Sequence, residues 1–287
     1  MKVPFRRNAF HSIPNFGLMG YTASQSKLGR IFKSDAIDLV RGLPDESVDL
    51  IVTDPAYESL EKWRKLGTTT RLKKSKGSSS EWFETFPNSR YAELFSQFYR
   101  VLKKGTHLYM FCDEETRDVV LTGFSPQNPG MGMLRYKGME GGKAQVGMVS
   151  PLLEPGFKYW KSIIWDKVHP GMGYHYRGQH ELIILAEKVL KKGKHRRLNF
   201  ALWGDVLQVK RLKGKNFYPT EKPFDLIKIL IEQSSNPGDL ILDPFCGSGV
   251  VGQVCEATGR NYILGDIDPK ETINRLIGEN IQWQSNP

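Results

Sequence analysis

Two short apolar runs that each end in Asp-Pro constrain the fold of this chain more than any other feature. Residues 48–53 lead into Asp54-Pro55-Ala56-Tyr57, and residues 240–242 lead into Asp243-Pro244-Phe245-Cys246-Gly247-Ser248-Gly249. Apolar runs of this length that are bounded by Pro, Gly and Asp are typical of strands buried inside a parallel sheet. We therefore expect two loops at carboxyl ends of strands, where open α/β sheets bind their ligands.

Amphipathic segments alternate with these apolar runs. Residues 91–103, 224–233 and 250–258 show helical spacing, while 31–32, 107–112, 159–165, 181–186 and 263–264 are expected to be strands. The alternation predicts an α/β fold with a doubly wound, mostly parallel sheet in a single domain, residues 1–287. Three segments interrupt it: a long polar stretch (58–90), a Gly-, Pro- and Met-rich insertion expected to be irregular (124–158), and a basic stretch (189–217).

The charge of the chain favours nucleic acid as a partner. The formal net charge is +10, and Lys and Arg are concentrated in residues 71–76 and 188–215. Such clusters supply sequence-independent contacts to phosphates. We expect no membrane span, because no apolar run approaches about 20 residues. The three cysteines and six histidines show no metal-ligand spacing, so we expect no metal site and a cytoplasmic protein.

The second Asp-Pro loop has the pattern of an adenosine-binding site. Gly247 and Gly249 allow the backbone to approach a ligand closely, and a helix is expected to begin just after them. Asp266 follows the next strand, about 20 residues on, where a carboxylate accepts the two ribose hydroxyls. The Gly-Lys-Ser/Thr ending of a phosphate-binding loop is absent. A tight strand-to-helix turn without a ligand is the alternative interpretation.

The first loop has groups suited to an aromatic amine. The exocyclic amine of adenine or cytosine is a poor nucleophile, because its lone pair is delocalised into the ring. The carboxylate of Asp54 and the carbonyl of Pro55 are two acceptors that can bind its hydrogens and free that lone pair, while Tyr57 can stack on the base. Proline also stiffens the loop and has no competing N–H. An ordinary Asp-Pro turn is again the alternative.

Three runs of this sequence resemble DNA amino-methyltransferases: residues 43–57, 219–226 and 242–249. The order, with the catalytic run before the cofactor run, resembles the circularly permuted beta group of these S-adenosylmethionine-dependent enzymes. The resemblance implies a permuted, Rossmann-like methyltransferase fold with inserted DNA-recognition segments. One departure is Ala56, since the family usually has a second proline at this position.

The resemblance also implies roles for individual residues. The target amine would be held by Asp54, Pro55, Ala56 and Tyr57. The cofactor would be bound by Asp35, Thr220, Lys222, Asp243, Phe245, Gly247, Gly249 and Asp266. Within this set Asp35 would accept the adenine amine of the cofactor, Asp266 would bind its ribose, and Thr220 and Lys222 would lie near its carboxylate. His175, Tyr176 and Arg177 match the loop that lies over a flipped base.

We thus expect a DNA methyltransferase that flips a base out of double-stranded DNA and methylates the exocyclic amine of adenine. In this family a leading Asp favours adenine and a leading Ser favours cytosine. The alternatives are the same chemistry on cytosine, a non-catalytic DNA-binding protein with a degenerate fold (suggested by Ala56), and an RNA or protein methyltransferase. Association with a restriction enzyme, a homodimeric state and the recognition sequence are left open by the sequence, although residues 58–90, 124–158 and 189–217 are expected to read the DNA.

Overall fold

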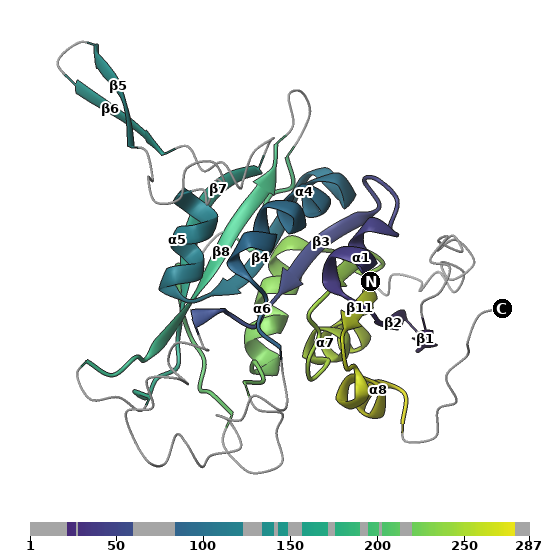
Figure 1. Cartoon of the computed structure of the whole chain (residues 1–287). Coiled ribbons are helices and arrows are strands. Elements are labelled where there is room, and N and C mark those ends of the chain that lie inside the picture. Colours follow the sequence, from purple (N-terminus) through teal and green to yellow (C-terminus); the bar gives the residue numbers. More distant parts are fainter. Residues whose placement is uncertain are drawn as a thin grey trace, which may run out of the picture.

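One sheet runs through the described part of the computed structural model, which comprises residues 22–26, 28–59, 84–122, 134–140, 143–148, 157–171, 176–189, 195–200, 203–212 and 220–278. The strands of this sheet lie in the order β1-β2-β11-β10-β3-β4-β8-β7-β9 (Figure 1). Their bounds are β1 Thr22–Gln25, β2 Gly29–Lys33, β3 Val48–Thr53, β4 Leu102–Cys112, β7 Phe157–Asp166, β8 His180–Lys188, β9 Val206–Gln208, β10 Leu240–Asp243 and β11 Asn261–Asp266.

The sheet is mostly parallel, as predicted. Strands β2, β11, β10, β3 and β4 form a continuous parallel block. Antiparallel pairings occur towards the edges, between β1 and β2, β4 and β8, and β7 and β8. The β3 strand is buried along its whole length. A strand covered on both faces has no polar side to expose, which explains the nearly continuous apolar run that marks it in the sequence.

Helices cover both faces of the sheet, so the predicted doubly wound architecture is confirmed (Figure 1). On one face pack α1 (Ala36–Arg41), α4 (Tyr91–Val101) and α5 (Glu114–Thr122). On the other pack α6 (Phe224–Ser234), α7 (Val250–Thr258) and α8 (Lys270–Leu276). Side chains of β3 alternate between the two cores, with Ile51 in the first and Leu50 and Val52 in the second.

The two Asp-Pro loops meet at the centre of the sheet. Strands β3 and β10 are parallel neighbours, with Leu50 opposite Ile241 and Ile51 opposite Leu242. Their carboxyl ends therefore lie at the same edge. The chain continues from β10 to β11 on one side and from β3 to β4 on the other. This reversal of strand order is the crevice in which open α/β sheets bind ligands.

The interrupting segments differ in part from the expectation. Residues 124–158 were expected to be irregular, and this is wrong for β5 (Leu134–Glu140) and β6 (Lys143–Met148), which form an antiparallel hairpin. The sequence signal is the Gly141-Gly142 pair between the two strands, a favoured pair for a two-residue hairpin turn. The basic stretch 189–217 contributes β9 to the sheet. Residues 60–83 lie outside the described residues.

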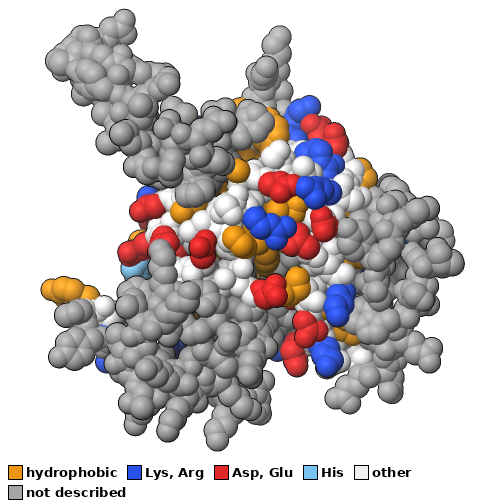
Figure 2. All heavy atoms as spheres, in the orientation of Figure 1, with side chains coloured by type: hydrophobic (Ala, Val, Ile, Leu, Met, Phe, Trp, Pro, Cys, Tyr) orange, Lys and Arg blue, Asp and Glu red, His pale blue; other side chains and the backbone are white. Residues whose placement is uncertain are grey.

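The helix expected over residues 91–103 ends instead at Val101. Leu102 already belongs to β4, where it pairs with Val48 of β3. Pairing to a neighbouring strand thus ends the helix before Gly105 is reached. No helix in the described ranges is long and apolar enough to cross a membrane. On the described part of the face in Figure 2, Lys and Arg side chains are interspersed with Asp and Glu.

Candidate active site

A cavity of about 780 Å³ opens at the carboxyl ends of β3 and β10. This volume lies within the range of typical small-ligand sites. The structure brings nearly all of the predicted site residues to its walls: Asp35, Asp54, Pro55, Ala56, Tyr57, Thr220, Lys222, Asp243, Phe245, Gly247 and Asp266. Gly249 does not line the cavity. It caps the N-terminus of α7 with φ at 78°, so it shapes the loop from behind.

The loop after β3 is held in a defined shape by hydrogen bonds. The Tyr57 hydroxyl donates to Oδ1 of Asp54 over 2.6 Å. The Ala56 carbonyl accepts from the Phe86 backbone N–H over 2.7 Å, and Tyr57 forms a β-bridge with the same residue. The Ser59 hydroxyl hydrogen-bonds to Asp113 just beyond β4. These contacts restrain a loop that lacks the second proline of the family pattern.

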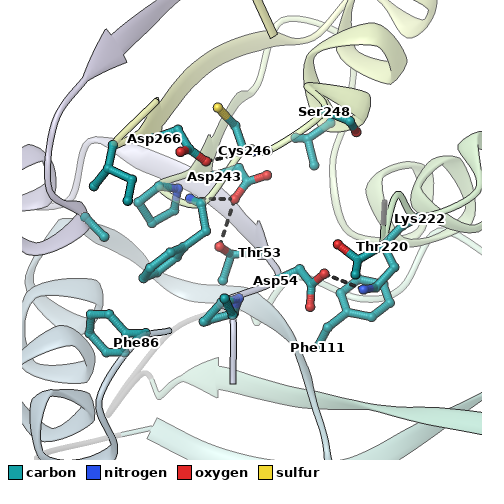
Figure 3. A pocket seen from close by; sticks show the side chains of 18 of the residues that line it. Thr53, Asp54, Phe86, Phe111, Thr220, Lys222, Asp243, Cys246, Ser248 and Asp266 are labelled. Carbon is teal, nitrogen blue, oxygen red and sulfur yellow. Dashed lines mark hydrogen bonds and ion pairs between the residues drawn. The ribbon is translucent and has the colours of Figure 1, made fainter. Parts of the chain in front are cut away.

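Asp54 is also in contact with a cation. The ammonium of Lys222, 7% exposed, pairs with Oδ2 of Asp54 and lies 3.2 Å from Oε2 of Glu181. Figure 3 shows Asp54 and Lys222 facing each other beside the ring of Phe111. Burial raises the pKa of Asp54 and Lys222 opposes that rise, whereas for Glu181 the nearby lysines outweigh burial and lower the pKa. Both carboxylates share one buried ammonium.

A buried hydrogen bond joins the two loops. The Thr53 hydroxyl donates to Oδ1 of Asp243 over 2.8 Å, and the Phe245 N–H donates to the same oxygen over 3.1 Å (Figure 3). Burial raises the pKa of Asp243 to about 7. Because the end of β3 and the start of the glycine-rich loop share this bond, Asp243 fixes the position of one loop relative to the other.

The glycine-rich loop is arranged around Asp266 at the end of β11. Its carboxylate accepts the Gly247 N–H over 2.9 Å and the Asp268 N–H over 3.0 Å. Burial raises the pKa of Asp266, and these backbone donors oppose the rise. Gly247 has φ at 46°, a conformation that favours glycine. The loop is therefore shaped by the same carboxylate that was predicted to bind ribose.

Asp35 has a structural task as well as a place on the cavity wall. It caps the N-terminus of α1, where its carboxylate accepts the N–H groups of Ile37 and Asp38. Arg90 donates two hydrogen bonds of 2.8 Å to its two oxygens and also lies 5.2 Å from the centre of the Phe86 ring. Arg90 lines the cavity too.

The lining fits a nucleoside that carries a charged tail. The half-buried carboxylate of Asp266 has acceptor capacity beyond the N–H groups of Gly247 and Asp268, which suits ribose hydroxyls. The edge-to-face rings of Phe86 and Phe245, 5.1 Å apart, give an apolar surface for a planar group. Polar lining from Asp54, Thr220 and Lys222 lies beyond it (Figure 3). A cofactor of the predicted kind is compatible with this set of groups.

Sequence reasoning missed Glu181, Arg90, Phe86 and Phe111, all of which line the cavity. Their neighbours in sequence form no motif, and only the strand order and the loop after β3 bring them to the site. Tyr176 and Arg177, expected over a flipped base, do not line the cavity. His175 lies outside the described residues. Within the described ranges no group of three or more His, Cys, Asp or Glu side chains could hold a metal ion.

Comparisons with known proteins agree with this geometry. A family model described as DNA methylase matches residues 48–275. The Type II methyltransferase M.HinfI of Haemophilus influenzae is 27% identical over 261 residues, which span 82% of this chain and 64% of that protein. The DNA adenine methyltransferase YhdJ of Escherichia coli (strain K12) is 28% identical over 247 residues, which span 81% of this chain and 76% of that protein. This chain thus spans less than two thirds of the Haemophilus protein.

A solved structure shares the fold. The PvuII DNA methyltransferase (cytosine-N4-specific) superposes with a TM-score of 0.58 at 16% identity, covering 93% of this chain and 92% of that one. At this identity the likeness concerns the fold alone. It agrees with a mostly parallel sheet that carries helices on both faces.

Proposed function

The chain belongs to the DNA methylase family, and we propose that it transfers a methyl group from S-adenosylmethionine to the exocyclic amine of adenine in double-stranded DNA. Family membership confirms the predicted resemblance to DNA amino-methyltransferases, which use this cofactor. The observation that carries the proposal is the single cavity lined by both Asp-Pro loops. An acceptor for an amine and a loop for a nucleoside thus line the same cavity.

The residues of the first loop act on the target base. The Asp54 carboxylate accepts one hydrogen of the amine and the Pro55 carbonyl accepts the other, so that the nitrogen lone pair becomes available. Tyr57 supports this carboxylate through its 2.6 Å hydrogen bond. The base must leave the duplex to reach the cavity, at a cost of a few kcal/mol. Once the base is in the cavity, the contribution of the protein is to position the amine and to stabilise charge, and these two effects account for most of the acceleration.

The second loop, together with Asp266 at the end of β11 and Asp35 at the start of α1, holds the cofactor. Asp266 would bind the ribose, Asp35 the adenine amine, and Phe245 and Gly247 the region next to the sulfonium. The bound cofactor supplies an electrophilic methyl group to the activated amine. Asp243 supports this loop indirectly, since its carboxyl bonds to Thr53 and to the Phe245 N–H within the protein.

Adenine is favoured over cytosine as the target. The leading Asp54 is the type of residue that favours adenine in the resemblance, and the relative from Escherichia coli is named a DNA adenine methyltransferase. The cytosine alternative is the same chemistry on the other exocyclic amine, and a protein named cytosine-N4-specific shares this fold. Digesting the methylated DNA to nucleosides and separating them by mass spectrometry distinguishes the two. N6-methyladenine supports the proposal, whereas N4-methylcytosine refutes the choice of base.

The non-catalytic alternative, suggested by Ala56, is tested in the same assay. The contacts of Ala56 and Tyr57 with Phe86 restrain the loop at this position and favour an active enzyme. Purified protein is incubated with unmethylated double-stranded DNA and cofactor labelled in its methyl group. Salt-sensitive DNA binding without incorporation of label would support the non-catalytic alternative. Single-stranded RNA and a protein mixture serve as competing substrates, and we expect label only in DNA.

The segments proposed to contact DNA are residues 58–90, 124–158 and 189–217, large parts of which lie outside the described residues. The support is their excess of Lys and Arg and their position between the elements of the sheet. A cytoplasmic location stays a prediction from the sequence, and the sequence leaves a homodimeric state open. Light scattering on the purified chain, with and without DNA, determines the oligomeric state.

A further inference from the structure

Lys222 lines the cavity and stands between two carboxylates. Its ammonium pairs with Asp54 and lies 3.2 Å from Glu181, while its Nζ is 5.1 Å from the centre of the Phe111 ring. The residue immediately precedes Pro223, the N-cap of α6. Its side chain is thus fixed by a helix start behind it and by an aromatic ring beside it. The 7% exposure of the side chain leaves little access to solvent.

The two carboxylates contact this ammonium in different ways. With Asp54, Lys222 forms a hydrogen-bonded ion pair. With Glu181 the contact is a longer ion pair, in which the ammonium lies 3.2 Å from Oε2. The other oxygen of Glu181 pairs with Lys167 over 2.6 Å. Charges of alternating sign therefore run from Lys167 through Glu181 and Lys222 to Asp54.

The remaining groups around Asp54 are neutral or negative. Tyr57 donates to it from its own loop. Further titratable groups reach it electrostatically from the start of α4, the end of β4, the end of β10 and β8, namely Tyr91, Cys112, Asp243 and Glu181. Among these described groups, Lys222 supplies the positive charge in contact with Asp54. A buried carboxylate without such a partner binds a proton and can no longer accept two hydrogen bonds.

We propose that Lys222 is a positioning residue that keeps the Asp54 carboxylate ionised and directed into the cavity, where Asp54 and Glu181 compete for the one ammonium. The inference rests on the proposed function, in which Asp54 must accept a hydrogen of the target amine. It differs from the role that the sequence resemblance implied for Lys222, next to the carboxylate of the cofactor. In the structure the ammonium already has two carboxylate partners.

The two assignments differ in what the Lys222→Met variant loses. A positioning residue supports the reacting state, so its loss lowers kcat and moves the acidic limb of the pH profile, while cofactor affinity is kept. A cofactor ligand contributes to ground-state binding, so its loss weakens the cofactor Kd and leaves the pKa of Asp54 unchanged. The Lys222→Arg variant keeps the positive charge and is expected to rescue the pH profile.

Removing the charge of Lys222 and removing the charge of Glu181 shift the pKa of Asp54 in opposite directions, which makes the test specific. Removing the ammonium in Lys222→Met raises the pKa of Asp54, because an opposite charge is lost. Removing the nearby negative charge in Glu181→Gln lowers the same pKa and leaves Lys222 to Asp54 alone. A general loosening of the site would move both variants in the same direction or neither.

The experiment measures three quantities on the full chain. The Asp54 carboxyl is titrated by carbon NMR, with its signal assigned by its absence in Asp54→Asn, and kcat is measured against pH. Cofactor affinity is measured by calorimetry with S-adenosylmethionine. Lys103→Met is the matched control, since Lys103 pairs with Asp49 near the other end of β3. We expect this control to leave the pKa of Asp54 and the pH profile unchanged.

For Lys222→Met we expect the pKa of Asp54 and the acidic limb of kcat to rise by at least about one pH unit, with about tenfold lower kcat on that limb. Opposite shifts in Glu181→Gln and rescue by Lys222→Arg complete the expected pattern. An unchanged Asp54 pKa together with tenfold weaker cofactor binding would overturn the proposal. If Lys222→Met does not fold, the Asp54 pKa of Glu181→Gln is compared with that of the wild type, and a lower value supports the proposal while an unchanged or higher value overturns it. The NMR titration holds even if the wild type methylates no DNA, so the two proposals fail separately.

Discussion

Replacing Asp243 with Asn tests the buried link between the two loops most sharply. The carboxyl is 4% exposed and is bonded to the Thr53 hydroxyl and the Phe245 N–H. Burial raises its pKa from an ordinary value of 3.8 to about 7. The folded protein therefore holds a proton that the unfolded chain releases between these two pH values. Asn keeps the shape of the neutral acid and has no charge to bury.

The magnitude follows from the linkage of proton binding to folding. Between pH 3.8 and about 7 the unfolded chain carries one proton fewer at Asp243, so the free energy of unfolding falls as pH rises. At about 1.4 kcal/mol per pH unit, the total loss is about 4 kcal/mol. The contribution is complete below pH 3.8 and absent above about 7. The Asp243→Asn variant lacks this loss.

The assay is urea unfolding of the wild type and Asp243→Asn in the absence of cofactor, from acidic pH to pH 8. From the acidic to the neutral end of this range, we expect the free energy of unfolding of the variant to rise by about 4 kcal/mol relative to that of the wild type. Thr53→Val is the companion variant, because losing the hydroxyl donor raises the pKa of Asp243 further and extends the loss of stability to higher pH. A difference between wild type and Asp243→Asn that stays constant with pH would refute the reasoning.

Three further predictions concern the loop geometry, a cap and the DNA partner. Gly249→Ala is expected to destabilise the fold by about 1–3 kcal/mol in urea unfolding, since φ is 78° and the new Cβ would lie 2.8 Å from Thr272. The control Gly204→Ala places its Cβ in open space, so its free energy of unfolding should stay within about 0.5 kcal/mol of the wild type. Burial raises the pKa of Asp35, but Arg90 outweighs burial and lowers that pKa. The free energy of unfolding of Arg90→Met should therefore be about 0.5–1 kcal/mol lower than that of the wild type above pH 3.8, and the difference should be smaller below it. Equal differences at both pH values would contradict this. DNA affinity in a filter-binding assay should fall at least about tenfold between 50 and 200 mM salt, and a salt-independent Kd would argue against phosphate contacts.

The parallel centre of the fold could be predicted from the sequence because its strands are buried on both faces. Residues 48–53 and 240–242 are mostly apolar runs, and the helices around them keep a clear amphipathic spacing. The β5–β6 hairpin could not be predicted from periodicity, since its residues show no period that separates it from a loop; the Gly141-Gly142 pair was its one signal in the sequence. β1 and β9 were missed because strands of three or four residues carry too little pattern.

The candidate site was predictable where its residues follow a strand end. Asp54 directly follows β3, and Asp243 and Asp266 are the last residues of β10 and β11. Parallel pairing brings these strand ends to one edge of the sheet. Glu181 and Arg90 could not be found, because their partners lie far away in sequence. Lys222 lines the cavity, but its pairing with Asp54 depends on how the start of α6 packs over β3 and β4.

The central claim, that Asp54 acts on a base amine next to a separately bound cofactor, is tested most directly with Asp54→Ala. Transfer of the labelled methyl group to unmethylated DNA and calorimetric binding of S-adenosylmethionine are measured on the same preparation. We predict at least about a hundredfold loss of transfer with cofactor Kd within about threefold of the wild type. Transfer at the wild-type rate by this variant would contradict the account.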